Sequence, residues 1–111
     1  MKYLCLVYME EGTLSSVPDS ECLAYGESLR KGGHHIAAEA LQPVHTATTV
    51  RVRGGRVSMT DGPFAETKEQ LAGFYLIDAK DLDEAVQQAA KIPPARVGSI
   101  EVRPVRELSA R

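Results

Sequence analysis

The sequence predicts an α+β fold: a split βαβ sandwich with an inserted β-hairpin, in which two helices lie on one face of an antiparallel sheet. Residues 3–9 and 72–79 are apolar at nearly every position, as in strands covered on both faces, so both should be central in the sheet. Two further segments have helical spacing, and a glycine turn is flanked by β-branched residues. The length of 111 residues allows one domain, residues 1–111.

A helix and a second strand follow the first strand. The helical spacing begins at Pro18, where Ser16 is placed to cap the helix, and Gly32 and Gly33 supply a left-handed stop. Residues 34–41 (HHIAAEAL) then suit a strand, which is weakened by its alanines and ended by the following Gln-Pro pair. One stripe of the helix should be buried: Cys22, Tyr25 and Leu29.

The next segment predicts a β-hairpin. Its turn, Gly54-Gly55, can adopt positive φ. Counting outward from the turn puts Thr48 opposite Asp61 and divides the ribbon into an apolar and a polar face. A carboxylate at the end of the apolar face, such as that of Asp61, should be hydrogen-bonded or functional. The apolar face holds Val50, Val52, Val57 and Met59, and the polar face holds Arg51, Arg53, Arg56 and Ser58.

The second half of the chain again runs strand, helix, strand. After the strand at residues 72–79, Asp81 can cap a helix, and Glu84 completes a capping box. Ile92 and the two prolines after it end this helix. Residues 99–105 (SIEVRPV) alternate apolar and polar side chains, which is typical of an exposed edge strand. The buried stripe of the helix should be Leu82, Ala85, Val86, Ala89 and Ala90.

Two helices cannot cover both faces of a sheet of about five or six strands, so they should pack on one face. The inner strands are apolar on both sides, which leaves an apolar face without cover. We therefore expect a second copy of the chain to bury that face, most economically in a twofold homodimer.

Composition and charge exclude several classes of partner. The apolar fraction of 43% and the formal charge of −2 describe a globular protein with no basic field to attract nucleic acid or an anionic membrane. No apolar stretch could span a bilayer and the N-terminus does not resemble a signal peptide, so we expect a cytoplasmic location. Cys5 and Cys22 lack the spacing of a metal site or disulfide framework, and nucleotide-cofactor motifs are missing. Neither a metal nor a cofactor is expected, since ligand spacing is also missing among His34, His35 and His45.

Several stretches of the chain form a recognisable set. They are TDGPFAETKEQLAGFYLID at residues 60–78, then DLDEA, KIP and SIEVRPV, together with LQP at residues 41–43 and TATTVRVRGGRV at residues 46–57. Together they resemble the DGPF branch of the YCII-related domain family over residues 34–105. The resemblance implies ferredoxin-like protomers whose sheets face one another in a dimeric α/β barrel that encloses a pocket. Relatives in the wider superfamily include muconolactone isomerase-like, monooxygenase-like and dehydrochlorinase-like enzymes.

The resemblance implies less about chemistry than about fold. Members of the DGPF branch often occur beside extracytoplasmic-function sigma factors, so such a sigma factor is an expected partner. YCII-type relatives with proposed chemistry use a His and an Asp in the pocket. His34 and His35 stand where DGPF relatives more often carry apolar residues, so they depart from the pattern of the branch.

Asp61 is the first candidate for catalysis. A carboxylate at the end of a strand and beside an apolar face could serve as a general base. The alternative is structural, because Asp-Gly-Pro forms turns in which the Asp side chain accepts backbone N–H bonds and Gly62 adopts positive φ. Phe64 is a candidate for substrate binding, and its alternative is an anchor that pins the loop to the core.

Polar side chains elsewhere complete the candidate site. Glu66 and Lys68 offer an acid–base group and an anion contact within one loop, and the alternative is a solvated turn with local ion pairs. Glu39, Gln42 and Tyr8 could supply polar groups to a pocket otherwise lined by apolar side chains. For Glu39, an edge strand that faces solvent is an equal explanation.

Two functions fit these residues. The first is a cofactor-independent enzyme, in which a dimer-enclosed pocket binds a small polar or aromatic molecule and Asp61 acts as base, with Glu66 or Lys68 as the second group. The second is a non-enzymatic ligand-binding or regulatory accessory protein, because the sequence has no recognisable nucleophile, metal set or phosphate loop. A dimer with a purely structural role is the third alternative.

Overall fold

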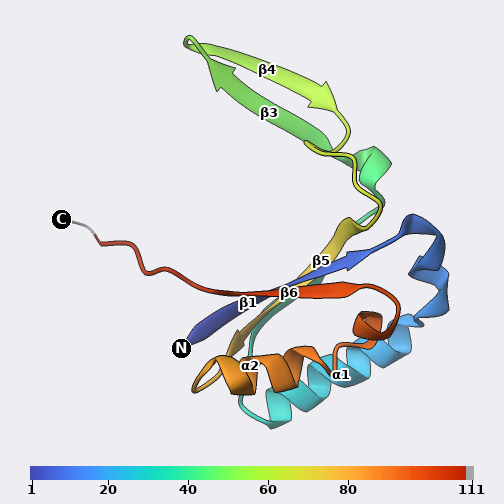
Figure 1. Cartoon of the computed structure of the whole chain (residues 1–111), viewed down its shortest axis with the longest axis vertical. Coiled ribbons are helices and arrows are strands. Elements are labelled where there is room, and N and C mark those ends of the chain that lie inside the picture. Colours follow the sequence, from blue (N-terminus) through green and yellow to red (C-terminus); the bar gives the residue numbers. More distant parts are fainter. Residues whose placement is uncertain (110–111) are drawn as a thin grey trace.

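The computed structural model describes residues 1–109 as a four-stranded antiparallel sheet, two helices and a separate two-stranded hairpin (Figure 1). The strands are β1 (Lys2–Met9), β2 (His35–Ala40), β3 (Thr48–Arg53), β4 (Arg56–Asp61), β5 (Gln70–Asp78) and β6 (Ser99–Pro104). The helices are α1 (Asp19–Lys31) and α2 (Leu82–Ala89), and short 3-10 turns cover Glu11–Ser16, Val44–Thr46 and Pro93–Arg96. The predicted order of strands and helices is confirmed.

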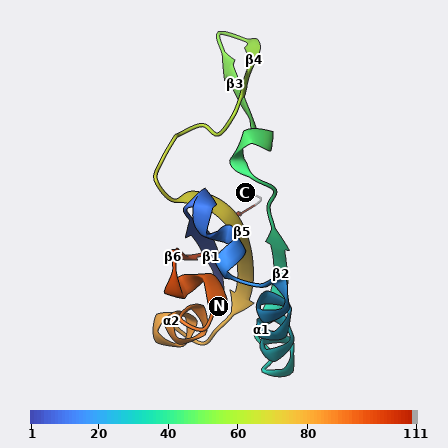
Figure 2. The same cartoon turned by 90° about the vertical axis from the view of Figure 1, so that its right-hand side faces the viewer.

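The four strands of the sheet lie in the order β2-β5-β1-β6. Helix α1 connects β1 to β2 and α2 connects β5 to β6, and in each case a strand of the other unit lies between the connected pair. Two interleaved split βαβ units make a ferredoxin-like fold, which confirms the predicted fold class. The strands that are apolar almost throughout, β1 and β5, are the central pair, and β6 is an edge strand, as predicted. Both helices lie on the same side of the sheet (Figure 2).

The core lies between the sheet and the helices. The buried side chains of β1 alternate along the strand from Tyr3 to Met9 and pack with Leu29 of α1 and Ile77 of β5. The remaining side chains of the central strands point to the opposite face, which has no helix over it in residues 1–109 (Figure 1). We call this the open face. Its large apolar side chains are half-buried: Leu4, Leu6, Tyr8, Phe74 and Leu76.

The start of α1 differs from the prediction. The Ser16 hydroxyl donates a hydrogen bond to the carbonyl oxygen of Thr13 at 2.6 Å, and Pro18 occupies the capping position without a side-chain bond. The prediction that Ser16 caps α1 is therefore wrong, because the preceding segment is already coiled into a 3-10 turn that uses this hydroxyl. The predicted stop is confirmed, since Gly33 has a φ of 76°.

Helix α2 is capped as predicted but buries a narrower stripe. The Asp81 carboxylate accepts a hydrogen bond from the Glu84 backbone N–H at 2.9 Å, and the Glu84 carboxylate accepts from the Lys80 N–H at 3.1 Å. Only the small residues of the predicted stripe, Ala85 and Ala89, are buried; the others, Leu82, Val86 and Ala90, are not. Close packing of the alanine side against the sheet leaves the larger side chains at the rim. Neither helix of the described chain is long and apolar enough to cross a bilayer.

Strands β3 and β4 form the predicted hairpin with the predicted register, from Arg53 opposite Arg56 to Thr48 opposite Asp61. The prediction that the hairpin extends the main sheet to five or six strands is wrong, because the hairpin stands away from it as a ribbon of its own (Figures 1 and 2). We call this ribbon, residues 48–61, the arm. Periodicity fixes pairing within a ribbon but not the place of the ribbon relative to the sheet.

Candidate functional site

A groove of about 430 Å³ runs between α1 and the half of the sheet formed by β2 and β5. It is open to solvent along one side and falls in the size range of small-molecule sites. We call it the α1 groove. Its walls are Val7, Met9, Val17, Asp19, Cys22, Leu23, Gly26, Arg30, His35, Ala38, Glu39, Ala40, Leu41, Ala72, Gly73, Phe74, Tyr75 and Pro94.

Small residues on both walls make this space. On α1, a Cβ added at Gly26 would meet only the Arg30 guanidinium, at 3.9 Å, so it would enter open space. On β5, a Cβ added at Gly73 would lie 2.8 Å from the carbonyl oxygen of Glu39, so only glycine lets β2 approach this closely. The alanines of β2 that weaken it as a strand therefore have a physical role: with Gly26 and Gly73 they leave the groove unfilled.

The floor of the α1 groove holds the ring of Tyr75 and the thiol of Cys22, and Tyr25 lies behind Tyr75 in the core. The rings of Tyr25 and Tyr75 meet edge to face, with centroids 5.1 Å apart and an interplanar angle of 87°. The Tyr25 hydroxyl donates a hydrogen bond to the backbone carbonyl of Gln88 at 2.8 Å, which fixes the pair against α2. Burial raises the pKa of Tyr75 to about 12, so its phenol is neutral at physiological pH. Neutral phenols donate hydrogen bonds to a ligand without offering a negative charge.

Cys22 lies beside Tyr75 on the same floor. Burial raises the pKa of the Cys22 thiol, the neighbouring Asp19 carboxylate raises it further, and a hydrogen bond from Tyr75 acts in the opposite direction. Both cysteines of the described chain, Cys5 and Cys22, are free. A protonated thiol is a weak nucleophile, so Cys22 is suited to contact a ligand and not to attack it.

The two ends of the α1 groove differ in charge. Arg30 and His35 flank the turn from α1 into β2 and so lie at the same end, whereas Asp19 lies at the other. The Arg30 guanidinium is 3.1 Å from the Glu27 carboxylate, an exposed pair. In the part of the chain described, the half-buried His35 side chain makes no hydrogen bond. The anionic group of a ligand bound at this end would face Arg30, and the apolar part of the ligand would lie over the small residues of the groove.

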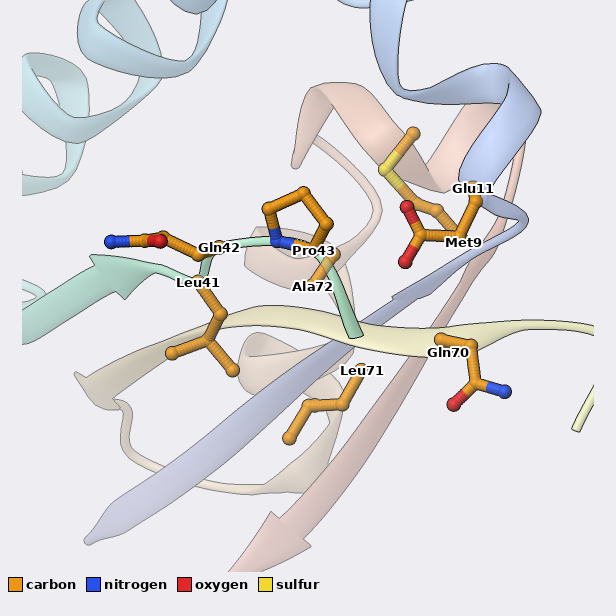
Figure 3. A pocket seen from close by; sticks show the side chains of 8 residues that line it. All are labelled: Met9, Glu11, Leu41, Gln42, Pro43, Gln70, Leu71 and Ala72. Carbon is orange, nitrogen blue, oxygen red and sulfur yellow. The ribbon is translucent and has the colours of Figure 1, made fainter. Parts of the chain in front are cut away.

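A second, much smaller pocket adjoins the groove where β2 ends (Figure 3). It has a volume of about 10 Å³, room for one water molecule. The Glu11 carboxylate at its rim accepts a hydrogen bond from the Val44 backbone N–H at 2.9 Å, so it tethers the segment after β2. In Figure 3 the Gln42 amide points away from Glu11. The lining residues are Met9, Glu11, Leu41, Gln42, Pro43, Gln70, Leu71 and Ala72.

The polar residues predicted to line a pocket are divided between three places. Glu39 borders the α1 groove, although its register opposite Phe74 turns the side chain toward the open face. Gln42 lines the small pocket, and Tyr8 lies on the open face. In a single copy these three side chains do not converge on one cavity.

Asp61 lies at the base of the arm. Its carboxylate is exposed and makes no hydrogen bond or ion pair among residues 1–109. The turn after it is held by the backbone, since the Gly62 N–H donates to the Ala47 carbonyl at 2.7 Å and the Thr49 hydroxyl donates to the Gly62 carbonyl at 2.9 Å. The predicted positive φ of Gly62 is confirmed at 102°, but the prediction that the Asp61 side chain accepts the N–H bonds is wrong.

The rest of the charged loop lies outside the α1 groove. Phe64 is 80% exposed, so its interpretation as an anchor in the core is wrong. Glu66 is exposed, and the Lys68 ammonium lies 3.6 Å from the Glu10 carboxylate at the surface. Within one copy, the structure brings neither Asp61 nor these loop residues to the groove.

The two adjacent histidines have different places. The His34 ring bonds through Nδ1 with the carbonyl oxygen of Asp78 at 2.8 Å and lies 3.8 Å from the Glu84 carboxylate, so it joins β5 to α2. His35 instead lines the α1 groove. Alternation along a strand could have indicated that only one of the two faces α1. Across residues 1–109, no group of three or more His, Cys, Asp or Glu side chains is arranged to hold a metal ion.

Comparison with known proteins places this fold in a family. A family model, the YCII-related domain, matches residues 1–109. The chain belongs to the YCII-related domain family. Membership of the DGPF branch within that family stays a prediction.

Two relatives of this YCII-related protein are informative. An uncharacterized protein of Rhizobium meliloti (strain 1021) is 52% identical over 67 residues, which are 59% of this chain and 54% of that protein, so the chain spans about half the length of this relative. A solved structure of 5-chloro-2-hydroxyhydroquinone dehydrochlorinase (TftG) from Burkholderia phenoliruptrix AC1100, in complex with 2,5-dihydroxybenzoquinone, is similar at a TM-score of 0.58 and 17% identity, covering 96% of this chain and 94% of that one. At this identity the likeness shows the fold alone.

Proposed function

We propose that this YCII-related protein binds a small polar or aromatic molecule in the α1 groove and converts it by acid–base chemistry that needs no cofactor. The observation that carries the proposal is the groove itself, about 430 Å³ in volume and kept free by Gly26, Gly73 and the alanines of β2. A well-packed domain without a ligand would fill such a space with larger side chains. The small residues are therefore best explained by a molecule that occupies it.

The groups around the groove suit a flat ligand that carries oxygen substituents. The protonated Tyr75 phenol and Cys22 thiol offer hydrogen-bond donors on the floor, and Arg30 offers a positive charge at one end. The neighbour TftG, a dehydrochlorinase of the same fold, was solved with 2,5-dihydroxybenzoquinone bound. A hydroxylated ring of that size is therefore a reasonable first probe for this chain.

For the proton transfer we retain Asp61 as the base, with Glu66 or Lys68 as the second group and Phe64, Gln42, Glu39 and Tyr8 as binding residues. Because Asp61 and the loop lie outside the groove of their own copy, they reach a ligand only if a second copy supplies them or if residues 62–69 move. His35, inside the groove and without a hydrogen bond in the described chain, is the competing acid–base group. Asp61→Asn and His35→Gln should separate the two: the variant that abolishes turnover while keeping the melting temperature identifies the base.

Binding in the α1 groove is tested by filling it. Gly26→Leu adds a side chain that enters the groove, and leucine also favours the helix more than glycine does. We expect the variant to be as stable as the natural protein but to lose binding of 2,5-dihydroxybenzoquinone, measured by calorimetric titration. Ala24→Leu, the same side chain on the exposed side of α1, is the matched control and should bind normally. Equal binding by both variants would place the ligand elsewhere.

We also propose that the protein is a homodimer joined through the open face. The face carries five large apolar side chains that a twofold partner would bury, as in a dimeric α/β barrel. Sedimentation equilibrium at micromolar concentration should give the mass of a dimer. A monomer mass there would rule out this assembly.

The second candidate is a non-enzymatic accessory protein of the DGPF branch that works with an extracytoplasmic-function sigma factor in the cytoplasm. The placement of Asp61, Glu66 and Lys68 outside the groove of their own copy favours it, because the groove could then bind a ligand without converting it. Free thiols at Cys5 and Cys22 suit a reducing compartment. A sigma factor that copurifies in moderate salt, from cells that also yield ligand-bound protein without turnover, would favour this candidate over the enzyme.

A further inference from the structure

The arm presents the most exposed apolar surface of the strands. Val50 and Val52 are each 58% exposed, Val57 is 68% exposed and Met59 is 72% exposed. All four share one face of the ribbon, as the pairs Val50–Met59 and Val52–Val57 show. A two-stranded ribbon is marginally stable by itself in water, so this face needs a partner surface.

The four-stranded sheet and its two helices, which we call the body, do not supply that surface within the same copy. In both views the helices lie on one side of the sheet and the arm stands off on the other side, the side of the open face (Figures 1 and 2). Any molecule that covers the open face must therefore come close to the arm. This makes the arm continuous with the dimer interface proposed above.

The charges of the chain indicate which molecule covers the open face and the arm. The arm, residues 48–61, holds three arginines, Arg51, Arg53 and Arg56, and one acidic residue, Asp61 at its base. The whole chain has 13 basic and 15 acidic side chains, so the rest of the chain has ten basic against 14 acidic ones. A basic arm is attracted to an acidic body, and a second copy offers such a body in twofold symmetry.

The limited apolar area of the open face also favours a second copy as the partner of the arm. The apolar side chains of the open face are already half-buried within one copy. Each of them therefore offers a partner less apolar surface than one of the exposed apolar side chains of the arm does. Stable interfaces bury roughly 800 Å² on each partner. Contacts made by the arm would add to the area that the two sheets bury against each other.

We infer that the arm docks on the body of a second copy, with its valine and methionine face against that body and its arginines beside acidic side chains, so that each copy clasps the other. The inference rests on the proposed homodimer. It goes beyond the sheet-to-sheet contact, because a dimer can exist without engaging the arm.

The test replaces Val50, Val52 and Val57 together by Thr and measures the dimer dissociation constant by sedimentation equilibrium. Thr keeps the β propensity of the ribbon while making the face polar. We expect the dimer to weaken by about 100-fold, as for the loss of several buried methyl groups. Replacing Arg51, Arg53 and Arg56 by Gln should weaken the dimer by about 10-fold at low salt and reduce its salt dependence. Ser58→Thr, on the polar face, is the control and should leave the constant unchanged.

The outcomes distinguish the docking of the arm from the homodimer on which it rests. A dimer whose constant is unchanged in the Thr and Gln variants would overturn the docking of the arm and leave the sheet-to-sheet dimer standing. A natural protein that is monomeric at micromolar concentration would overturn both. A dimer that weakens in both sets of variants, but not in Ser58→Thr, would support the arm as the clasp.

Discussion

The body and the arm reach their structures in different ways. In the body, strands β1 and β5 bury one face under two helices, and Leu29, Ile77, Ile92 and Cys5 are almost completely buried. In the arm, eleven of the twelve strand residues are exposed, on both the apolar and the polar face, and Thr49 at the base is half-buried.

 

The body is stabilised by burial within one copy, whereas the arm is stabilised by its ladder of backbone hydrogen bonds, its turn and a few side-chain hydrogen bonds such as that from Ser58 to the Arg51 carbonyl. The comparison teaches that a segment can have a well-defined local structure and still lack the contacts that fix its position. In this protein those contacts are the ones we assign to a second copy.

The largest effect is expected where the body is most tightly packed. A Cβ added at Gly98 would overlap the carbonyl oxygen of Tyr8, and because this atom belongs to the backbone of a central strand, the overlap cannot be relieved by a side-chain movement. Gly98→Ala should lower the free energy of unfolding by about 3 kcal/mol, measured by urea denaturation. Gly12→Ala, where a Cβ meets nothing within 4 Å, is the control and should have little effect. Equal stability of the two variants would contradict the close approach at Gly98.

A matched pair of truncations compares the two regions directly. Leu29→Ala removes a side chain that is 1% exposed and should cost about 3 kcal/mol of unfolding free energy. Val52→Ala in the arm should cost less than about 0.5 kcal/mol at a concentration where the copies are separated. A large loss for Val52→Ala under those conditions would mean that the arm packs on its own body.

Alkaline pH should act on the body. Burial raises the pKa of the Cys5 thiol from 9.0 to about 11, so between these values the thiol ionises in the unfolded chain but stays protonated in the folded one. The unfolded state then binds fewer protons, so stability should fall by about 2 kcal/mol as the pH rises from 9 to 11. Cys5→Ala should flatten this part of the pH profile of unfolding free energy. An unchanged profile in the variant would assign the decline to other groups.

The smallest effect is expected in the charged loop. The Lys68 ammonium and the Glu10 carboxylate are 3.6 Å apart and largely exposed, so solvent screens their attraction. Lys68→Ala should change the free energy of unfolding by less than about 0.5 kcal/mol. A larger loss, compared with Lys80→Ala at another exposed position, would show that the loop is held more firmly than its contacts indicate.

Much of the fold could be predicted from the sequence, because its causes are local. Glycine at positions 54 and 55 fixed the hairpin register, and the unbroken apolar character of β1 and β5 placed them at the centre of the sheet. The position of the arm could not be predicted, because alternation specifies pairing within a ribbon and not the surface against which it packs.

The candidate site was harder to predict, because the α1 groove consists of missing side chains. Gly26 and Ala38 give no signal of chemistry, and their meaning depends on α1 facing β2. Charged residues such as Asp61 and Lys68 attract attention in a sequence, yet in one copy they lie outside the groove. His35 could have been distinguished from His34 only with the register of β2 against β5.

The central claim is that the body holds the ligand and the arm holds the partner. Titration of 2,5-dihydroxybenzoquinone into ¹⁵N-labelled protein, followed by backbone amide shifts, tests it most directly. We expect the largest shifts at Gly26, Ala38 and Gly73, with little change at Val52 and Val57 of the arm. Shifts confined to the arm, or the same shifts in Gly26→Leu as in the natural protein, would contradict the claim.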